Sequence, residues 1–156
     1  MVRRLSELPE VEAKHLSTTR IVCPTYDDTP LLPGKPLAAR RVAIISTAGL
    51  HKRGDRAFDR DDGSYRVIPA ETPASDLVMS HVSVNFDRTG FQQDHNVVFP
   101  IDRLRELVAD GTVGSMASVH YSFMGAFPVD AAQPHAKHLA GLLKADKVDA
   151  ALLVPV

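Results

Sequence analysis

The sequence has a single cysteine among its 156 residues. One cysteine, Cys23, excludes an intrachain disulfide and a zinc cluster made of several cysteines. Lys and Arg number 18 and Asp and Glu number 19, so the charge balance gives no sign of a nucleic-acid-binding surface or of an anionic membrane anchor. No segment approaches the roughly 20 apolar residues of a membrane span, and no apolar stretch follows the two arginines at the start. We therefore expect a cytoplasmic protein that has neither nucleic acid nor a membrane as a partner.

The first 39 residues differ in character from the rest. Residues 1–17 predict a weakly amphipathic helix whose apolar stripe is Leu5, Leu8, Val11 and Leu16. The following segment, IVCPTYDDTPLLPGKP, contains four prolines and predicts an irregular, partly extended arm. We therefore divide the chain into an N-terminal helix with a proline-rich arm, 1–39, and an α/β domain, 40–156.

The remaining sequence alternates strand and helix patterns. The predicted strands are Val42–Ser46, SYRVIP, SHVSVNFD, VHYSFMG and Ala150–Val154, and the predicted helices are PIDRLRELVADG and the segment that begins at Asp130. A polar loop, HKRGDRAFDRDDG, follows the first strand. This order predicts an α/β fold with an open, mostly parallel sheet and flanking helices.

The last strand pattern is apolar throughout, as in parallel strands that are covered on both faces. The sequence ends two residues later, at Val156, where the carboxyl end of such a strand borders a ligand site in open α/β sheets. We therefore expect the sheet to be incomplete at its C-terminal end.

The segment TAGLHKRGD follows a strand end, where backbone amides and His51, Lys52 and Arg53 could receive an anion such as a carboxylate. A solvated basic loop is the competing interpretation. The spacing is neither that of a P-loop nor that of a dinucleotide-binding turn.

Three histidines, with two aspartates, could form a metal site: His81, His95 and His120, with Asp87 and Asp94. None of these residues has the spacing that makes a metal site specific. His81 and His120 lie at or near strand ends, so strand capping or core hydrogen bonding is the alternative for both.

Several ordered blocks resemble the selenoprotein B family of glycine, sarcosine, betaine and D-proline reductases. They cover roughly residues 40–156 and are TAGLHKRGD, SYRVIP, SHVSVNFD, NVVFPIDRLRELVADGTVG, HYSFMGA and VDAALLVPV. The resemblance implies an α/β protein that reductively cleaves a C–N bond of an amino acid or its N-methyl derivative. It also implies that a redox selenocysteine, or a cysteine in some relatives, follows the strand DAALLVPV directly. On this view residues 40–156 are a truncated reductase-like domain that is inactive alone.

The resemblance also suggests site residues and partners. The catalytic candidates are His81, His120 and Tyr121, and the substrate-binding candidates are His51, Asp55, Arg66 and Asp87. In this scheme His81 or His120 helps to protonate the leaving nitrogen, and His51 or Arg66 holds the substrate carboxylate. No cofactor or metal is expected on this chain, whereas a pyruvoyl group on a partner subunit is implied. The expected partners are an amino-acid-like small molecule and other reductase subunits, or a second copy of the chain.

Two alternatives to the reductase interpretation remain at this point. The chain could be a catalytically silent module that binds a ligand or another subunit. It could also be a metal-dependent hydrolase or lyase that uses His81, His95 and His120.

Overall fold

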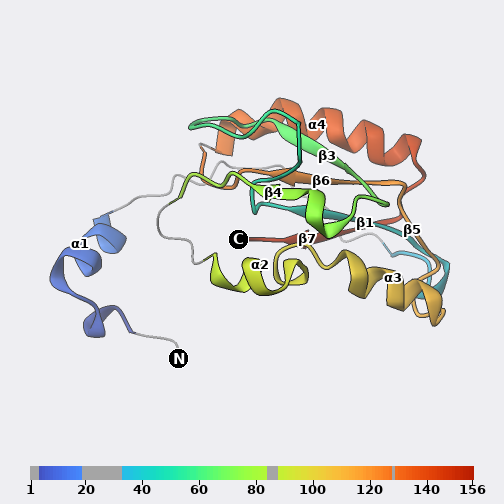
Figure 1. Ribbon diagram of the computed structural model, residues 1–156, viewed down its shortest axis with the longest axis horizontal. Coiled ribbons are helices and arrows are strands. Elements are labelled where there is room, and N and C mark those ends of the chain that lie inside the picture. Colours follow the sequence, from blue (N-terminus) through green and yellow to red (C-terminus); the bar gives the residue numbers. More distant parts are fainter. Residues whose placement is uncertain (1–3, 19–32, 84–87, 128) are drawn as a thin grey trace.

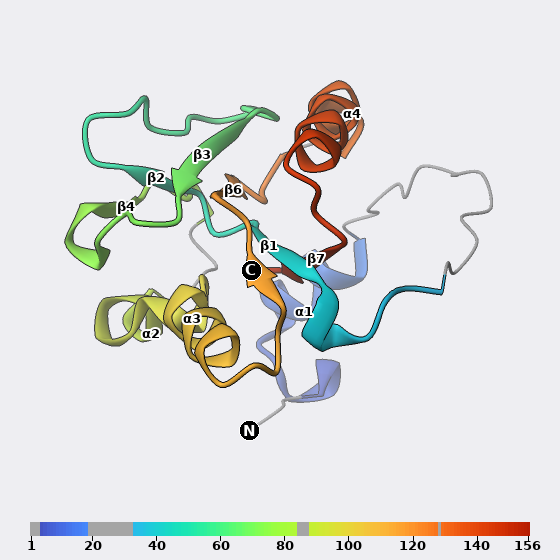
Figure 2. The ribbon, with the colours of Figure 1, turned by 90° about the vertical axis from the view of Figure 1, so that its right-hand side faces the viewer.

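The computed structural model describes residues 4–18, 33–83, 88–127 and 129–156. Its main body has three layers, with one helix on one face of a central sheet and shorter helices on the other face (Figure 1 and Figure 2). The single covering helix is α4, Val129–Ala145. The opposite face carries α2, Thr89–Gln93, and α3, Ile101–Ala109.

The central sheet is built around β1, Arg41–Ser46. Strand β7, Ala150–Val154, runs parallel to β1 along one side. On the other side β1 pairs in parallel first with β5, Ser115–Met116, and then with β6, Val119–Phe123. Strand β3, Tyr65–Pro69, is antiparallel to β6 and forms the far edge. The prediction of an α/β fold with a mostly parallel sheet is confirmed.

A second, two-stranded sheet lies beside the first. Strand β2, Leu50–Lys52, pairs antiparallel with β4, Leu77–Met79. Short 3-10 turns complete the described elements: η1, Leu5–Glu7; η2, Leu37–Ala39; η3, Ala74–Asp76; and η4, His95–Val97.

Apolar side chains form a core on each face of the sheet. On the α3 face, Ile44, Ile68 and Phe99 pack together with Leu104 of the helix. On the α4 face, Tyr121 and Phe123 pack against Leu139. The helical periodicity of PIDRLRELVADG thus predicted a real buried stripe, because Ile101 and Leu104 are both in the core.

Some predicted elements differ in the structure. The alternation of SHVSVNFD predicted a strand, but residues 80–83 have no regular structure, and residues 84–87 lie outside the described part. Strand β4 ends just before this segment. The polar segment after β1 was predicted to be a loop, yet it begins within β2. Both β2 and β4 are only three residues long, too short for a periodic signal.

The predicted N-terminal helix is divided by Pro9. Its described part consists of η1 and α1, Glu10–Thr18, which Figure 1 shows to one side of the sheet. Of the predicted stripe, Val11 is 81% exposed, Leu5 is also exposed and Leu8 is half-buried. Among the described residues, no helix combines the length and the apolar character needed to cross a membrane.

Candidate active site

The parallel strands β1, β6 and β7 end at one edge of the sheet, here called the carboxyl edge. Thr47, the residue after β1, joins two of these strand ends. Its backbone N–H donates to the carbonyl of Val154 at 3.1 Å, and its Oγ1 accepts from the N–H of Val156 at 2.8 Å. The Thr47 hydroxyl also donates to the Val156 carbonyl at 3.3 Å. The backbone that follows β7 is therefore held directly beside the end of β1.

Two glycines bring His81 to the same edge. Gly49 and Gly125 both have positive φ, 66° and 85°, which L side chains rarely adopt. A Cβ on Gly49 would lie 2.9 Å from the His81 backbone. A Cβ on Gly125 would lie 2.5 Å from the Thr47 carbonyl oxygen and 3.1 Å from His81 Nε2. Thr47, Gly49, His81, Gly125 and Val156 therefore form one cluster, here called the carboxyl-edge site.

The His81 ring is buried and oriented. It is 5% exposed, and its Nδ1 accepts the backbone N–H of Ser83 at 3.1 Å. The proton of the neutral ring is therefore on Nε2, the nitrogen nearest Gly125. Burial, and then the positive charge of Arg88, lower the pKa of His81 below its usual value. The neutral ring thus presents an N–H donor at the carboxyl-edge site.

His120 has a different environment, inside the sheet. Strands β5 and β6 are interrupted between Met116 and Val119, and the His120 Nδ1 accepts the N–H of Ile44 at 2.9 Å. The imidazole therefore takes the place of a backbone carbonyl in the ladder. Burial, and then the nearby Arg105, lower the pKa of His120 to about 4. Its Nε2 has no hydrogen-bond partner among the described residues, and the ring packs edge-on against Phe99.

His51 lies on β2, beyond Gly49, and is also buried. Its Nδ1 is 3.0 Å from the Lys52 carbonyl oxygen, which can only accept, so Nδ1 carries the proton. The Nε2 lone pair of the neutral ring has no partner within the described part of the chain. Asp55 follows on an exposed turn, with its N–H donating to the Lys52 carbonyl. The Nε2 atom of His51 can therefore accept a hydrogen bond from a ligand.

Arg66, on β3, is bonded mainly to the loop that precedes the strand. Its Nη2 donates to Asp62 at 2.7 Å and to Ala57, and its guanidinium lies 4.1 Å from the centre of the Phe58 ring. The remaining N–H groups donate to Ser64 Oγ and to the carbonyls of Arg56 and Tyr65. Burial alone would raise the pKa of Asp62, but hydrogen bonds from Ser64 and Arg66 outweigh it and lower that pKa. All five donors of Arg66 are used to hold this loop together, and none is left for a substrate carboxylate.

Tyr121 follows His120 on β6 and therefore faces the opposite side of the sheet. It lies under α4, edge-on to Tyr65 with ring centroids 5.5 Å apart, and burial raises its pKa. The structure does not bring Tyr121 together with His120 or the carboxyl-edge site. Asp87 lies outside the described residues, as does Cys23, so the role predicted for Asp87 stays a prediction.

The described residues give no support to a metal site. They contain no group of three or more His, Cys, Asp or Glu side chains placed to hold an ion. His95 is instead 3.1 Å from Asp102 through its Nε2. The metal-dependent alternative therefore has no cluster within the part of the chain that the structure describes.

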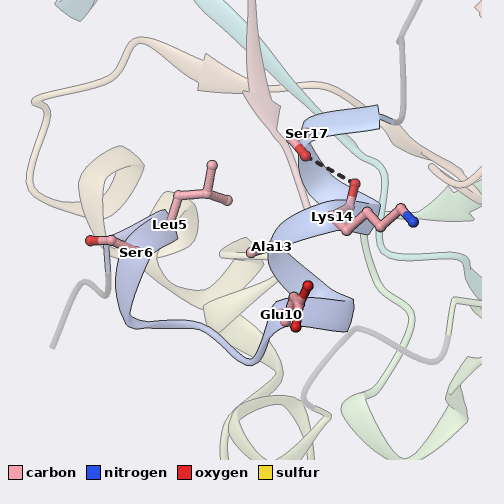
Figure 3. A pocket seen from close by; sticks show the side chains of 6 residues that line it. All are labelled: Leu5, Ser6, Glu10, Ala13, Lys14 and Ser17. Carbon is pink, nitrogen blue, oxygen red and sulfur yellow. Dashed lines mark hydrogen bonds between the residues drawn. The ribbon is translucent and has the colours of Figure 1, made fainter.

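A surface hollow of about 700 Å³ lies between η1 and α1 (Figure 3). Its lining residues are Leu5, Ser6, Glu10, Ala13, Lys14 and Ser17. None of them is a histidine, cysteine or aromatic residue, and none is among the predicted site residues.

Sequence reasoning did not single out Thr47 or Gly125 as site residues. Each lies at the end of a predicted strand, in STAG and FMGA. The small size of the residue at the strand end was the only sequence feature that pointed to a site there. The close approach of His81 to Gly125 depends on tertiary packing and has no local pattern.

Comparison with known proteins relates this sequence to a family. The family model described as Glycine/sarcosine/betaine reductase selenoprotein B (GRDB) matches residues 15–156. D-proline reductase subunit gamma of Acetoanaerobium sticklandii is 33% identical over 122 residues, which are 76% of this chain and 50% of that protein. Glycine reductase complex component B subunit gamma of Carboxydothermus hydrogenoformans is 29% identical over 143 residues, which are 87% of this chain and 33% of that protein.

A third relative, Sarcosine reductase complex component B subunit beta of Peptoclostridium acidaminophilum, is 27% identical over 113 residues, which are 69% of this chain and 26% of that protein. The chain thus spans half the length of the curated relatives it matches, or less. No solved structure gave a significant match. Because the family model covers nearly all of the chain, this protein belongs to the glycine/sarcosine/betaine reductase selenoprotein B family.

Proposed function

We propose that this chain supplies the carboxyl-edge site of a reductase subunit that cleaves a C–N bond of an amino acid or its N-methyl derivative. The observation that carries the proposal is the convergence of Thr47, Gly125, His81 and the end of β7. Family membership supports the reaction class, and the names of the relatives, all reductase subunits, support assembly with other subunits.

The redox group of the proposal is a selenocysteine or cysteine next to Val156, outside these 156 residues. Such a group supplies the reducing electrons as a selenolate or thiolate. The residues at the carboxyl edge suit an anion, because Thr47 fixes the backbone there and His81 presents its Nε2–H. A pyruvoyl group on a partner subunit also stays a proposal, and the roles given to this chain do not depend on it.

His81 is the proposed donor at this site, in preference to His120. An anion placed beside His81 would favour its protonated form and raise its lowered pKa, which would make it a better proton donor. His120 is instead committed to the Ile44 N–H, and its pKa of about 4 keeps it neutral near pH 7. We therefore assign His120 a positioning role within the sheet.

His51 is the proposed substrate contact, with a role different from the predicted one. Its neutral ring offers an acceptor at Nε2, which suits the N–H of an amino substrate. To hold a carboxylate, the same ring would first have to gain a proton.

Titration with glycine, sarcosine, betaine and proline tests the substrate class. In NMR spectra of the purified chain, we expect at least one of these compounds to shift the ring signals of His81 or His51. The variant His81→Gln should weaken that response, whereas His95→Gln, a change in η4, should retain it. If none of the four compounds shifts the ring signals of His81 or His51, the proposal is overturned and the silent-module alternative is favoured.

A turnover assay tests where the redox group lies. The purified chain should release no ammonia or amine from these four compounds when a dithiol is the reductant, because the proposed redox residue is outside the chain. Measurable dithiol-dependent turnover would contradict that placement.

A further inference from the structure

The last strand, β7, is unusually exposed for its composition. Its sequence is AALLV, yet Leu152 is 42% exposed and Leu153 is 67% exposed. The two side chains point to opposite faces of the sheet, since successive residues of a strand alternate. Apolar strands of this kind are normally covered on both faces. The strand therefore has the composition of an interior strand but the surroundings of an edge strand.

The hydrogen-bonding edge of β7 is also open. Within the described part of the chain β7 pairs with β1 alone, so its other edge has no strand partner. Edge strands that are left open usually carry charges or prolines that discourage pairing. Residues Ala150–Val154 carry neither.

On one face, the adjoining helix α4 has an unfilled apolar flank. Val129, Ala132, Ala136 and Ala140 line a hollow of about 370 Å³, together with Gln133 and Lys137. His138 bonds to the Tyr65 hydroxyl at 2.9 Å and so marks the flank of α4 that faces β3. At 100° per residue, the alanines lie on the opposite flank, toward β7. Ala136 is exposed on this flank.

On the other face, a second apolar groove borders β7. It has a volume of about 250 Å³ and is lined by Leu37, Val42, Leu104, Leu107, Val113 and the first three residues of β7. The open edge of β7, this groove and the alanine flank of α4 are together called the β7 surface.

We propose that the β7 surface docks a further β-strand and an amphipathic helix of the same reductase, supplied by the part of the longer relatives that this chain does not match. That part is large, since the match covers 50% of the D-proline reductase subunit and 33% of the glycine reductase subunit. The strand pairs with the open edge of β7. The helix packs on Leu153 and the alanines of α4, where small side chains allow close approach.

Charge favours this occupant over a second copy of the chain. Lys137 borders the alanine flank of α4. A two-fold pair formed through this flank would bring like-charged Lys137 side chains toward one interface, whereas a docking helix can place an acidic residue there. The inference rests on family membership and does not depend on the proposed roles of His81 and His51.

Co-expression tests the inference without any activity measurement. The 156-residue chain is produced together with the unmatched half of the Acetoanaerobium sticklandii D-proline reductase subunit gamma. Size-exclusion chromatography with light scattering should show a one-to-one complex, and hydrogen exchange of Ala150–Val154 should slow at least tenfold on complex formation. The variant Leu153→Asp should weaken the complex at least tenfold.

Val67→Asp is the matched control, because Val67 is an exposed apolar residue of β3, the opposite edge of the same sheet. It should leave the complex intact, and circular dichroism checks that both variants are folded. Absence of a complex, or equal loss with both folded variants, would overturn the inference. A stable dimer of the chain alone that Leu153→Asp dissociates would also overturn it, because the occupant would then be a second copy.

Discussion

At the scale of single residues, Gly125 holds the carboxyl-edge site together. Its φ of 85° disfavours any side chain, and a Cβ would press on the Thr47 carbonyl oxygen and on His81 Nε2. Gly125→Ala should therefore destabilise the fold by about 2–4 kcal/mol and displace the His81 ring. Urea denaturation measures the first effect, and the NMR signals of the ring report the second.

The matched control for this change is Gly111→Ala. Gly111 has a similar φ of 81°, but a Cβ there would meet nothing within 4 Å. Only the strain of a side chain at positive φ remains, so Gly111→Ala should reduce the stability of the fold by about 1–2 kcal/mol. Equal losses for the two variants would show that Gly125 is not packed against Thr47 and His81.

His120 should make stability depend on pH. Its pKa is lowered from 6.5 to about 4 in the folded state, so the unfolded chain binds the proton more readily. The contribution of His120 to the free energy of unfolding is therefore fully present above about pH 6.5 and is lost as the pH falls toward 4. The total loss from this group is about 3 kcal/mol. Urea denaturation from pH 7.5 to 4 measures the slope.

His120→Asn removes the titrating ring and retains an acceptor for the Ile44 N–H. The variant should be less stable at pH 7, with a flatter slope between pH 6.5 and 4. Carboxylates with lowered pKa values, such as those of Asp62 and Asp146, titrate in both proteins and cancel in the comparison. An unchanged slope would mean that His120 is not buried as a neutral ring.

At the scale of elements, the loop between β2 and β3 depends on Arg66. Arg66→Lys replaces five directed N–H donors by a single ammonium group, so the loop should lose about 2 kcal/mol of stability. Arg56→Lys is the control, because the Arg56–Asp59 pair is exposed and should be worth less than about 0.5 kcal/mol. Thermal unfolding measures the stability of both variants. A negligible effect of Arg66→Lys would contradict the proposed role of Arg66 in holding the loop.

The length of an element decides whether its sequence pattern can predict it. Strands β1, β3, β6 and β7 and helices α3 and α4 were predicted because each has a local apolar pattern long enough to recognise. The strands β2, β4 and β5 have three residues or fewer, so tertiary pairing defines them. The alternation in SHVSVNFD was misleading for residues 80–83, the described part of the segment, where His81 is buried and Val82 exposed without regular structure.

The candidate site was predictable only in part. His81, His120 and His51 could be named from their places near strand ends, but their protonated nitrogens depend on Ser83, Ile44 and Lys52, which no spacing reveals. Arg66 was predicted to bind substrate, and nothing in SYRVIP indicates that its donors are used to hold the preceding loop.

At the scale of the whole molecule, the β7 surface and the carboxyl-edge site adjoin at the end of β7. The β7 surface and the carboxyl-edge site share one strand, so a segment docked on β7 would lie next to His81 and Thr47. We therefore expect the docked segment and the reacting groups to lie next to each other, and separate experiments test the two.

The most direct test of the central claim is the pKa of a thiol placed at the end of β7. A Cys-Gly dipeptide is appended after Val156 in a Cys23→Ser background, and the thiol pKa is measured from the pH dependence of alkylation. The Nε2–H of His81 should stabilise the thiolate and lower its pKa from about 8.5 to about 7.5 or below. His81→Ala should restore the ordinary value, whereas His95→Ala should not. A thiol pKa of about 8.5 or higher that does not respond to His81→Ala would contradict the claim that the end of β7 and His81 form one site.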